Sequence, residues 1–230
     1  MYNYIIGIID EDSEDIQDIE RTIIVNKPEN IAEEQIAFNS YTIPVNTSGL
    51  SNDIANAVIN DIVNDKIQVL IVDYKIIVST ALVEGTEIFR RISETVPKFP
   101  IIILTNVPED CYKKEFVDAD KVYSKGQFFK LEENYSKEKT LNIFRNMDNY
   151  TAQRAKLSTK LANHLSLLET QGYSVQTLKD IIETEKLLDN FFPQQQSTVE
   201  KELNVSDLKN AVELLREAND LLGGQNENLE

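Results

Sequence analysis

The sequence is poor in the residues that build metal clusters and redox sites. Its 230 residues include one cysteine, Cys111, and one histidine, His164. A single cysteine excludes an intramolecular disulfide, and the two residues together exclude a zinc site rich in cysteine or histidine. Any metal that this chain binds would therefore need oxygen ligands.

Basic residues and long apolar runs are scarce as well. The chain has 23 Lys and Arg against 39 Asp and Glu, a formal net charge of −16. Such a surface repels nucleic-acid phosphates and anionic lipids, so we expect neither nucleic acid nor a membrane as a partner. No apolar run approaches the roughly 18 residues of a membrane span, and the N-terminus lacks the basic start of a targeting signal. We expect a cytoplasmic protein.

Short apolar runs alternate with helical patterns in the first half of the chain. This alternation is typical of βαβ units and predicts an α/β fold, a doubly wound five-stranded parallel sheet of the flavodoxin-like kind. The expected strands are residues 4–9, 35–41, 69–72, 101–104 and 121–124. Helical spacing of apolar residues predicts crossover helices over residues 13–26, 52–64 and 85–96, and a weaker one over 109–117.

The second half of the chain predicts helices only. We therefore divide the chain into an α/β domain, residues 1–135, and a helical output or interaction region, residues 136–230. The helical region is expected to contain a hairpin (136–192, with Ser174 capping its second helix), a linker (193–205) and a third helix (206–222). Because it contains no basic recognition helix, we expect it to bind a protein partner or to form a homodimer.

Polar residues follow the predicted strands at the points where the strands end. Asp10, Glu11 and Asp12 follow the first, Asp73 the third, Thr105 the fourth and Lys125 the fifth. The carboxyl ends of parallel strands meet in one crevice, and clustered carboxylates there suit a hard cation such as Mg²⁺. A carboxylate beside such a cation can attack a phosphoryl group, while a lysine and a hydroxyl stabilise the phosphoryl oxygens.

Each of these residues alone also has a plainer interpretation. Acidic residues favour helix starts, and an aspartate often caps a turn. Threonine is common in strands, and an isolated lysine is usually on the surface. Their joint placement at the ends of the predicted strands favours a phosphoryl-transfer site over these separate structural roles.

This set, in this order, resembles the response-regulator receiver family of two-component signalling over about residues 3–135. The fragments that match are Ile9-Asp10-Glu11-Asp12, Ile71-Val72-Asp73, Ile103-Leu104-Thr105 and Ser124-Lys125. The resemblance implies that Asp73 is the phosphoacceptor and that Thr105 and Lys125 assist it. It also implies that Mg²⁺ is held by Asp10, Glu11, Asp73 and the backbone carbonyl of Lys75.

The sequence departs from the family pattern at several places around this site. Glu11 stands where the family usually has aspartate, and residues 74–84 form a longer connection than usual. The residues after Thr105 and Lys125 are Asn106 and Gly126, where the family prefers a small residue and a proline.

The resemblance implies a phosphoacceptor signalling protein. The sequence offers no second catalytic constellation outside this pocket, so we do not expect an enzyme acting on a small molecule. A histidine kinase or phosphotransfer protein would phosphorylate Asp73 in a Mg²⁺-dependent phosphorelay, and the C-terminal helices would pass the signal on. Two alternatives stay open. The first alternative is an adaptor with a degenerate, unphosphorylated receiver fold, and the second is a phosphate sink for a shared kinase. His164 lacks the surrounding residues of a phosphotransfer histidine.

Overall fold

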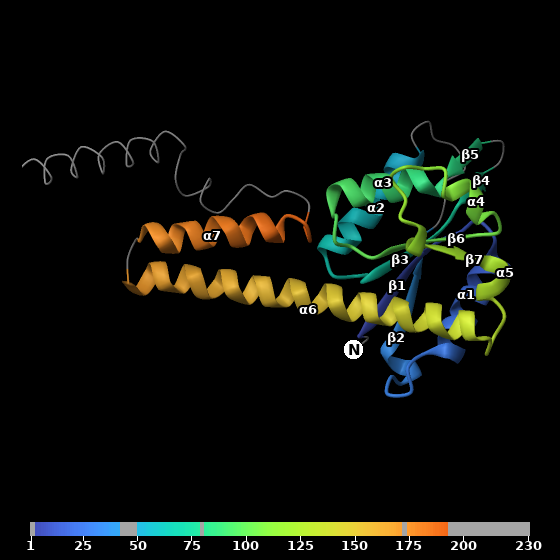
Figure 1. Ribbon diagram of the computed structural model, residues 1–230, viewed down its shortest axis with the longest axis horizontal. Helices are drawn as coiled ribbons and strands as arrows, with labels where there is room; N and C mark the ends of the chain where they lie inside the picture. Colours follow the sequence, from blue (N-terminus) through green and yellow to red (C-terminus); the bar gives the residue numbers. More distant parts are fainter. Residues whose placement is uncertain (1–2, 42–49, 79–80, 172–173, 193–230) are drawn as a thin grey trace, which may run out of the picture.

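The computed structural model describes residues 3–41, 50–78, 81–171 and 174–192 (Figure 1). The predicted linker (193–205) and third helix (206–222) lie outside the described residues. Within the described residues, five parallel strands form the main sheet in the order β2-β1-β3-β6-β7, and two further strands form the antiparallel pair β4-β5.

The main sheet confirms the predicted fold class. Its strands are β1 (Tyr4–Ile9), β2 (Ile36–Ser40), β3 (Val69–Asp73), β6 (Ile101–Thr105) and β7 (Val122–Ser124). All neighbouring pairs are parallel. Counted within this sheet alone, the strand order is 2-1-3-4-5, which is the flavodoxin-like doubly wound order.

Helices cover both faces of the sheet (Figure 1). Alternate residues of β3 point to opposite faces: Leu70 and Val72 pack in one core, and Val69 and Ile71 in the other. The first core includes residues of α2 (Leu50–Val63) and α3 (Gly85–Thr95), and the second includes residues of α1 (Ser13–Asn26) and α6 (Asn134–Gln171). Burial on both faces explains why the strands appear in the sequence as continuous apolar runs. Shorter elements are η1 (Glu33–Gln35), η2 (Ala119–Lys121) and α5 (Lys125–Phe128).

The weak fourth helix is much shorter than the sequence predicts. Instead of a helix over 109–117, α4 spans only Pro108–Cys111. The two aromatic residues that suggest a longer helix, Tyr112 and Phe116, are both exposed, and the buried residues of this stretch are Cys111 and Val117. The aromatic spacing therefore does not mark a buried helix face.

The long connection after Asp73 forms a β-hairpin. Its strands are β4 (Lys75–Val78) and β5 (Ala81–Glu84), paired antiparallel. Ile76 and Val83 face each other across the pair and are buried in the core beside α2 and α3. Burial of this one face holds the hairpin on the carboxyl edge of the main sheet.

The long helix α6 begins as a layer of the α/β core and then extends beyond it (Figure 1). Ile143, Phe144 and Met147 are buried against the sheet. The predicted boundary between residues 135 and 136 therefore lies inside a helix whose first half packs on the strands. With 38 residues, α6 is about 57 Å long at 1.5 Å per residue.

The final described helix, α7 (Val175–Leu188), lies antiparallel to the distal part of α6 (Figure 1). As predicted, the Ser174 side chain caps it by accepting a hydrogen bond from the Thr177 amide at 3.0 Å. Its C-terminal end returns to the α/β core, where Phe191 packs beside Phe99 and Tyr150. None of the helices in the described part of the chain has the length and apolar sequence needed to cross a bilayer.

Candidate functional site

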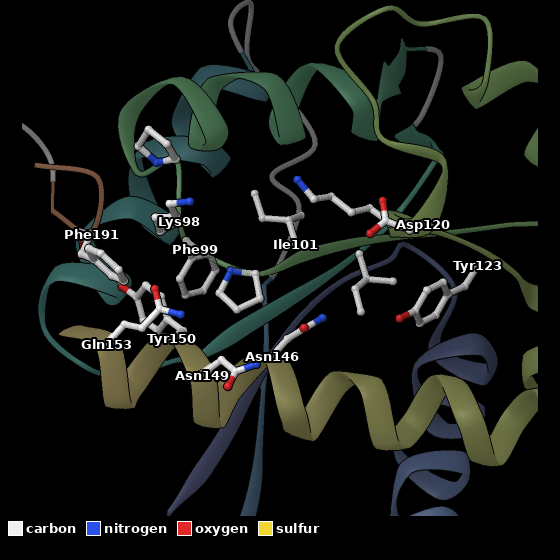
Figure 2. A pocket seen from close by; sticks show the side chains of 14 residues that line it. Lys98, Phe99, Ile101, Asp120, Tyr123, Asn146, Asn149, Tyr150, Gln153 and Phe191 are labelled. Atoms are coloured by element: carbon white, nitrogen blue, oxygen red, sulfur yellow. The ribbon is translucent and has the colours of Figure 1, made fainter. Parts of the chain in front are cut away.

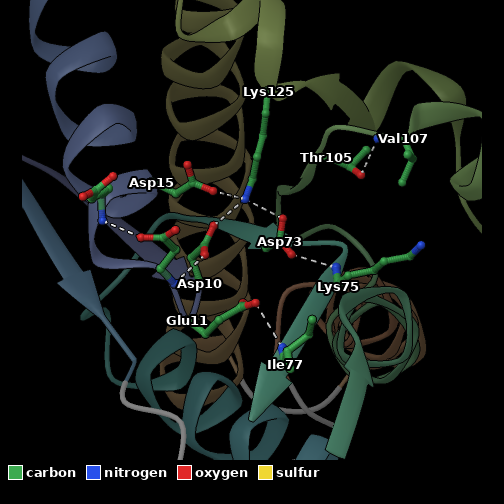
Figure 3. Close-up of polar contacts among 11 residues, drawn as sticks. Asp10, Glu11, Asp15, Asp73, Lys75, Ile77, Thr105, Val107 and Lys125 are labelled. Carbon is green, nitrogen blue, oxygen red and sulfur yellow. Dashed lines mark hydrogen bonds and ion pairs between the residues drawn. The ribbon is translucent and has the colours of Figure 1, made fainter. Parts of the chain in front are cut away.

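The predicted polar residues meet at the carboxyl edge of the main sheet (Figure 3). Asp10 directly follows β1, Asp73 is the last residue of β3, Thr105 is the last residue of β6, and Lys125 directly follows β7. All four are buried although all are polar. Burial of charged groups is costly unless they are paired, so their arrangement needs a compensating network.

Lys125 is the centre of that network. Its ammonium nitrogen lies 2.8 Å from Asp10 Oδ2, 2.6 Å from Asp73 Oδ1 and 2.6 Å from Asp15 Oδ2. A lysine ammonium has three N–H donors, so each carboxylate receives one. Figure 3 shows the lysine reaching from the start of α5 into the space between the three acids.

Asp15 is the site residue that the sequence analysis missed. It lies in the first turn of α1, whose N-cap is Asp12, the side chain of which accepts from the Glu14 amide at 2.8 Å. The sequence feature that could have revealed Asp15 is the high density of acidic residues directly after β1. Because α1 starts at the edge of the sheet, one side of its first turn faces the ends of the neighbouring strands, and Asp15 lies on that side.

The second oxygen of each buried aspartate is held by the backbone. Asp73 Oδ2 accepts from the Lys75 amide at 2.7 Å, and Asp10 Oδ1 accepts from the Asp12 amide at 2.9 Å. These bonds fix the orientation of both carboxyl groups. The Lys75 side chain lies elsewhere, with its ammonium 3.7 Å from Asp110 Oδ2 on α4.

Glu11 and Thr105 lie at the same edge but point to other partners. Glu11 is exposed, and its Oε1 accepts a hydrogen bond from the Ile77 amide on the hairpin at 3.1 Å. The Thr105 hydroxyl accepts from the Val107 amide at 3.0 Å. The structure therefore brings together Asp10, Asp73 and Lys125, and leaves Glu11 and Thr105 beside them with separate contacts.

Burial dominates the acid–base behaviour of the two central aspartates. Loss of solvation raises the pKa of Asp73 to about 6, although Lys125 opposes this shift. Burial likewise raises the pKa of Asp10 above its ordinary value. Burial alone would lower the pKa of Lys125, but its hydrogen bonds to the three aspartates outweigh that effect and raise it. Lys125 therefore stays charged, and both buried aspartates have a pKa above the ordinary aspartate value.

The donor chemistry of the site suits Mg²⁺. Asp10, Asp73 and Glu11 offer hard carboxylate oxygens, and three aspartates face a single ammonium, which leaves excess negative charge at the edge. Within the described ranges, no three His, Cys, Asp or Glu side chains converge closely enough to form a ready metal site. Asp10, Glu11, Asp73 and the Lys75 carbonyl are the groups that would hold the ion, and this assignment stays a prediction.

A separate cavity of about 360 Å³ lies near the start of β6, at the other end of that strand from Thr105. Figure 2 shows Asn146, Asn149 and Gln153 of α6 along one side of it, with Phe99 and Phe191 at one end. None of the strand-end residues lines this cavity. We therefore place the candidate functional site at the carboxyl edge of the sheet and not in the cavity.

The strand order defines a doubly wound α/β fold of the flavodoxin-like kind, followed by a helical region, with the polar strand-end residues gathered at one edge. No protein-family model matches the sequence, and no curated protein matches it significantly. Among solved structures, the chain is similar to the RcsB response regulator of Salmonella typhimurium, described in a study of its conformational dynamism for DNA interaction. The identity is 16%, the match covers 87% of this chain and 98% of that chain, and the TM-score is 0.37. The assignment of the fold therefore rests on the sheet itself, and that of the site on its residues.

Proposed function

We propose that this chain is a receiver-type signalling protein that accepts a phosphoryl group on Asp73 from a histidine kinase or phosphotransfer protein. The observation that carries this proposal is the contact between Asp73 and Lys125, buried at the carboxyl edge of the sheet with Asp10 beside them. A reactive carboxylate, a fixed cation and a second carboxylate are the groups that phosphoryl transfer to aspartate requires.

In the proposed reaction, a carboxylate oxygen of Asp73 attacks the phosphorus of a phosphohistidine. A phosphorus–oxygen bond to Asp73 forms, the phosphorus–nitrogen bond breaks, and the departing imidazole takes up a proton from solvent water. Lys125 stays protonated and neutralises the negative charge of the phosphoryl oxygens. Mg²⁺, when bound, supplies further neutralisation of those oxygens. The Thr105 hydroxyl accepts from the Val107 amide, and because a hydroxyl can accept and donate at the same time, its own proton can be donated to a phosphoryl oxygen.

Two contacts support a relay from Lys125 to the helical region. On one side of Lys125, the Ser124 amide donates to the Tyr135 hydroxyl at 3.0 Å. On the other side, the Phe128 carbonyl accepts from the Ser136 hydroxyl at 2.8 Å. Tyr135 and Ser136 both lie in the first turn of α6. A movement of Lys125 would therefore act on the start of this helix, and we propose that α6 and α7 pass the signal to a protein partner or to a second copy of the chain.

The test is Mg²⁺-dependent labelling of the full chain by acetyl phosphate. The parent protein is expected to gain one phosphoryl group, and Asp73→Asn is expected to gain none. Asp110→Asn is the matched control, because Asp110 lies partly exposed on α4 and contacts Lys75 but not Lys125. Labelling of Asp73→Asn at the rate of the parent would reject Asp73 as the phosphoacceptor.

One observation favours a second candidate, an adaptor that works without phosphorylation. Glu11, one of the predicted metal ligands, instead accepts a hydrogen bond from the Ile77 amide of the hairpin. On this alternative the parent protein takes no label, and calorimetric titration with Mg²⁺ gives no binding heat. Binding of Mg²⁺ that is lost in Asp73→Ala would reject the adaptor.

A further inference from the structure

All three donors of the Lys125 ammonium are engaged in this structure. The ammonium is shared among Asp10, Asp73 and Asp15, all within 2.8 Å. A lysine in this state cannot donate to a phosphoryl oxygen until it releases one of its three carboxylates. Phosphorylation of Asp73 would therefore require Lys125 to release one particular carboxylate. The inference of which one is released rests on the proposed function of Asp73.

The three carboxylates differ in their access to water. The side chains of Asp10 and Asp73 are 2% and 10% exposed, whereas that of Asp15 is 28% exposed. A carboxylate that loses its ion pair is stabilised by water only if water can reach it. Release of Asp15 is therefore less costly than release of Asp10, whose charge would be left buried. Asp73 itself carries the incoming group.

We propose that Asp15 is a positioning residue that competes with the phosphoryl group for Lys125. In the resting protein it holds the ammonium between Asp10 and Asp73. When Asp73 accepts the phosphoryl group, Lys125 exchanges Asp15 for a phosphoryl oxygen and keeps its proton, and Asp15 turns to solvent. Asp15 thus slows phosphoryl acceptance and favours the unphosphorylated state.

The experiment compares Asp15→Asn with Asp18→Asn in the full chain. Both variants remove one negative charge from α1, but Asp18 is exposed and has no contact with Lys125. A partly exposed ion pair is worth a few tenths to about 1 kcal/mol, so Asp15→Asn is expected to label up to about fivefold faster with acetyl phosphate than Asp18→Asn. Asp15→Glu keeps the charge and is expected to restore the slow rate.

A second measurement reads the contact without phosphorylation. The ¹⁵Nζ signal of Lys125, assigned with Lys125→Arg, reports the exchange of its ammonium protons with water. Asp15→Asn is expected to speed this exchange, and Asp18→Asn is expected to leave it unchanged. Thermal unfolding of each variant shows whether a change in labelling comes from loss of folded protein.

The outcomes separate this inference from the proposed function. If no variant takes a label but Asp15→Asn still frees the lysine protons, the phosphoacceptor function is wrong and the contact is real. If the parent labels on Asp73 while Asp15→Asn labels no faster than Asp18→Asn, the competition is overturned. Slower labelling of a folded Asp15→Asn protein would overturn it as well, since Asp15 would then assist the transfer.

Discussion

The backbone carbonyl of Asp73 leaves no room for a side chain at Gly85. A β-carbon on Gly85 would lie 1.9 Å from the Asp73 carbonyl oxygen and 2.9 Å from a methyl group of Val72. The Gly85 amide also donates to the Tyr74 carbonyl at 2.8 Å. The start of α3 is thus pressed against the end of β3, and the hairpin leaves and re-enters the core between these two residues.

We expect Gly85→Ala to destabilise the protein by about 1–3 kcal/mol or more, because overpacking against backbone cannot be relieved by a side-chain rotation. Gly126→Ala is the control, since a β-carbon there meets nothing within 4 Å. It lies inside the short helix α5 and should be neutral or stabilising by up to about 1 kcal/mol. Urea unfolding measures both. An unchanged free energy of unfolding in Gly85→Ala would show that the backbone at the contact between Asp73 and Gly85 can shift to make room for a side chain.

The raised pKa of Asp73, about 6, predicts how the site responds to pH. The folded-state pKa lies above that of an unfolded aspartate, about 3.9, so burial favours the protonated form. The contribution of Asp73 to stability is therefore fully present below about pH 4 and is lost as the pH rises through 6. Because the nucleophile is the carboxylate, labelling by acetyl phosphate is expected to increase over the same upper range.

Lys125→Met is expected to raise the pKa of Asp73 further, because Lys125 lowers it in the parent protein. A ¹³C NMR titration of the Asp73 carboxyl carbon, assigned with Asp73→Asn, measures the shift. Lys130→Met is the control, since Lys130 is exposed and pairs with Glu133 away from the site. A lower pKa in Lys125→Met would contradict the electrostatic description of the site.

The sequence predicts most of the sheet because its strands are buried on both faces. The bounds of β1 and α1 agree with those expected, since an unbroken apolar run and an acidic cap mark them clearly. The strand-end residues Asp10, Asp73 and Lys125 could be placed together because parallel strands present their carboxyl ends at one edge.

The features that were missed depend on packing that a sequence pattern does not specify. The run Ile76-Ile77-Val78 is short and looked like part of a loop, yet Ile76 is buried as a hairpin strand. Asp15 is one of several acids after β1, and only the position of Lys125 distinguishes it. The apolar spacing of α6 continues past residue 150, so it does not show where the sheet stops supporting the helix.

The first half of α6 is expected to be essential for folding of the α/β core. Phe144 is buried, and its ring contacts that of Tyr4 edge-on at 5.1 Å between centroids. Phe144→Ala should lower the free energy of unfolding by about 3–5 kcal/mol. Leu167→Ala, in the distal half of the same helix, changes a side chain that is already exposed and should have little effect. If both substitutions lowered the free energy of unfolding in urea by the same amount, the two halves of α6 would contribute equally to the stability of the core.

Phe191 is expected to hold the end of α7 on the core. Its ring lies 5.6 Å from that of Tyr150, its carbonyl accepts from the Tyr150 hydroxyl, and the neighbouring Asn190 carbonyl accepts from the Lys98 amide at 2.8 Å. Phe191→Ala should speed amide hydrogen exchange in α7 while leaving β3 protected. Leu187→Ala, exposed on α7, is the control. Uniformly faster exchange in Phe191→Ala would instead indicate global destabilisation.

The contact between Glu11 and the Ile77 amide is expected to link the hairpin to the metal site. Glu11→Ala removes the acceptor, so the Ile77 amide should exchange faster with water. Glu14→Ala removes an acid from the same acidic segment without touching the hairpin and should not change this exchange. Amide exchange followed by NMR measures the effect at one residue.

Addition of Mg²⁺ provides the decisive comparison for this contact. If Glu11 serves as a metal ligand, it must leave the Ile77 amide, and Mg²⁺ should speed exchange of that amide in the parent protein. In Glu11→Ala the exchange is already fast, so Mg²⁺ should add little. Binding of Mg²⁺ that leaves the Ile77 amide fully protected would place the ion without Glu11. The glutamate would then be a structural bond to the hairpin, and the extra methylene that distinguishes it from aspartate would be the part of the side chain that lets it reach Ile77.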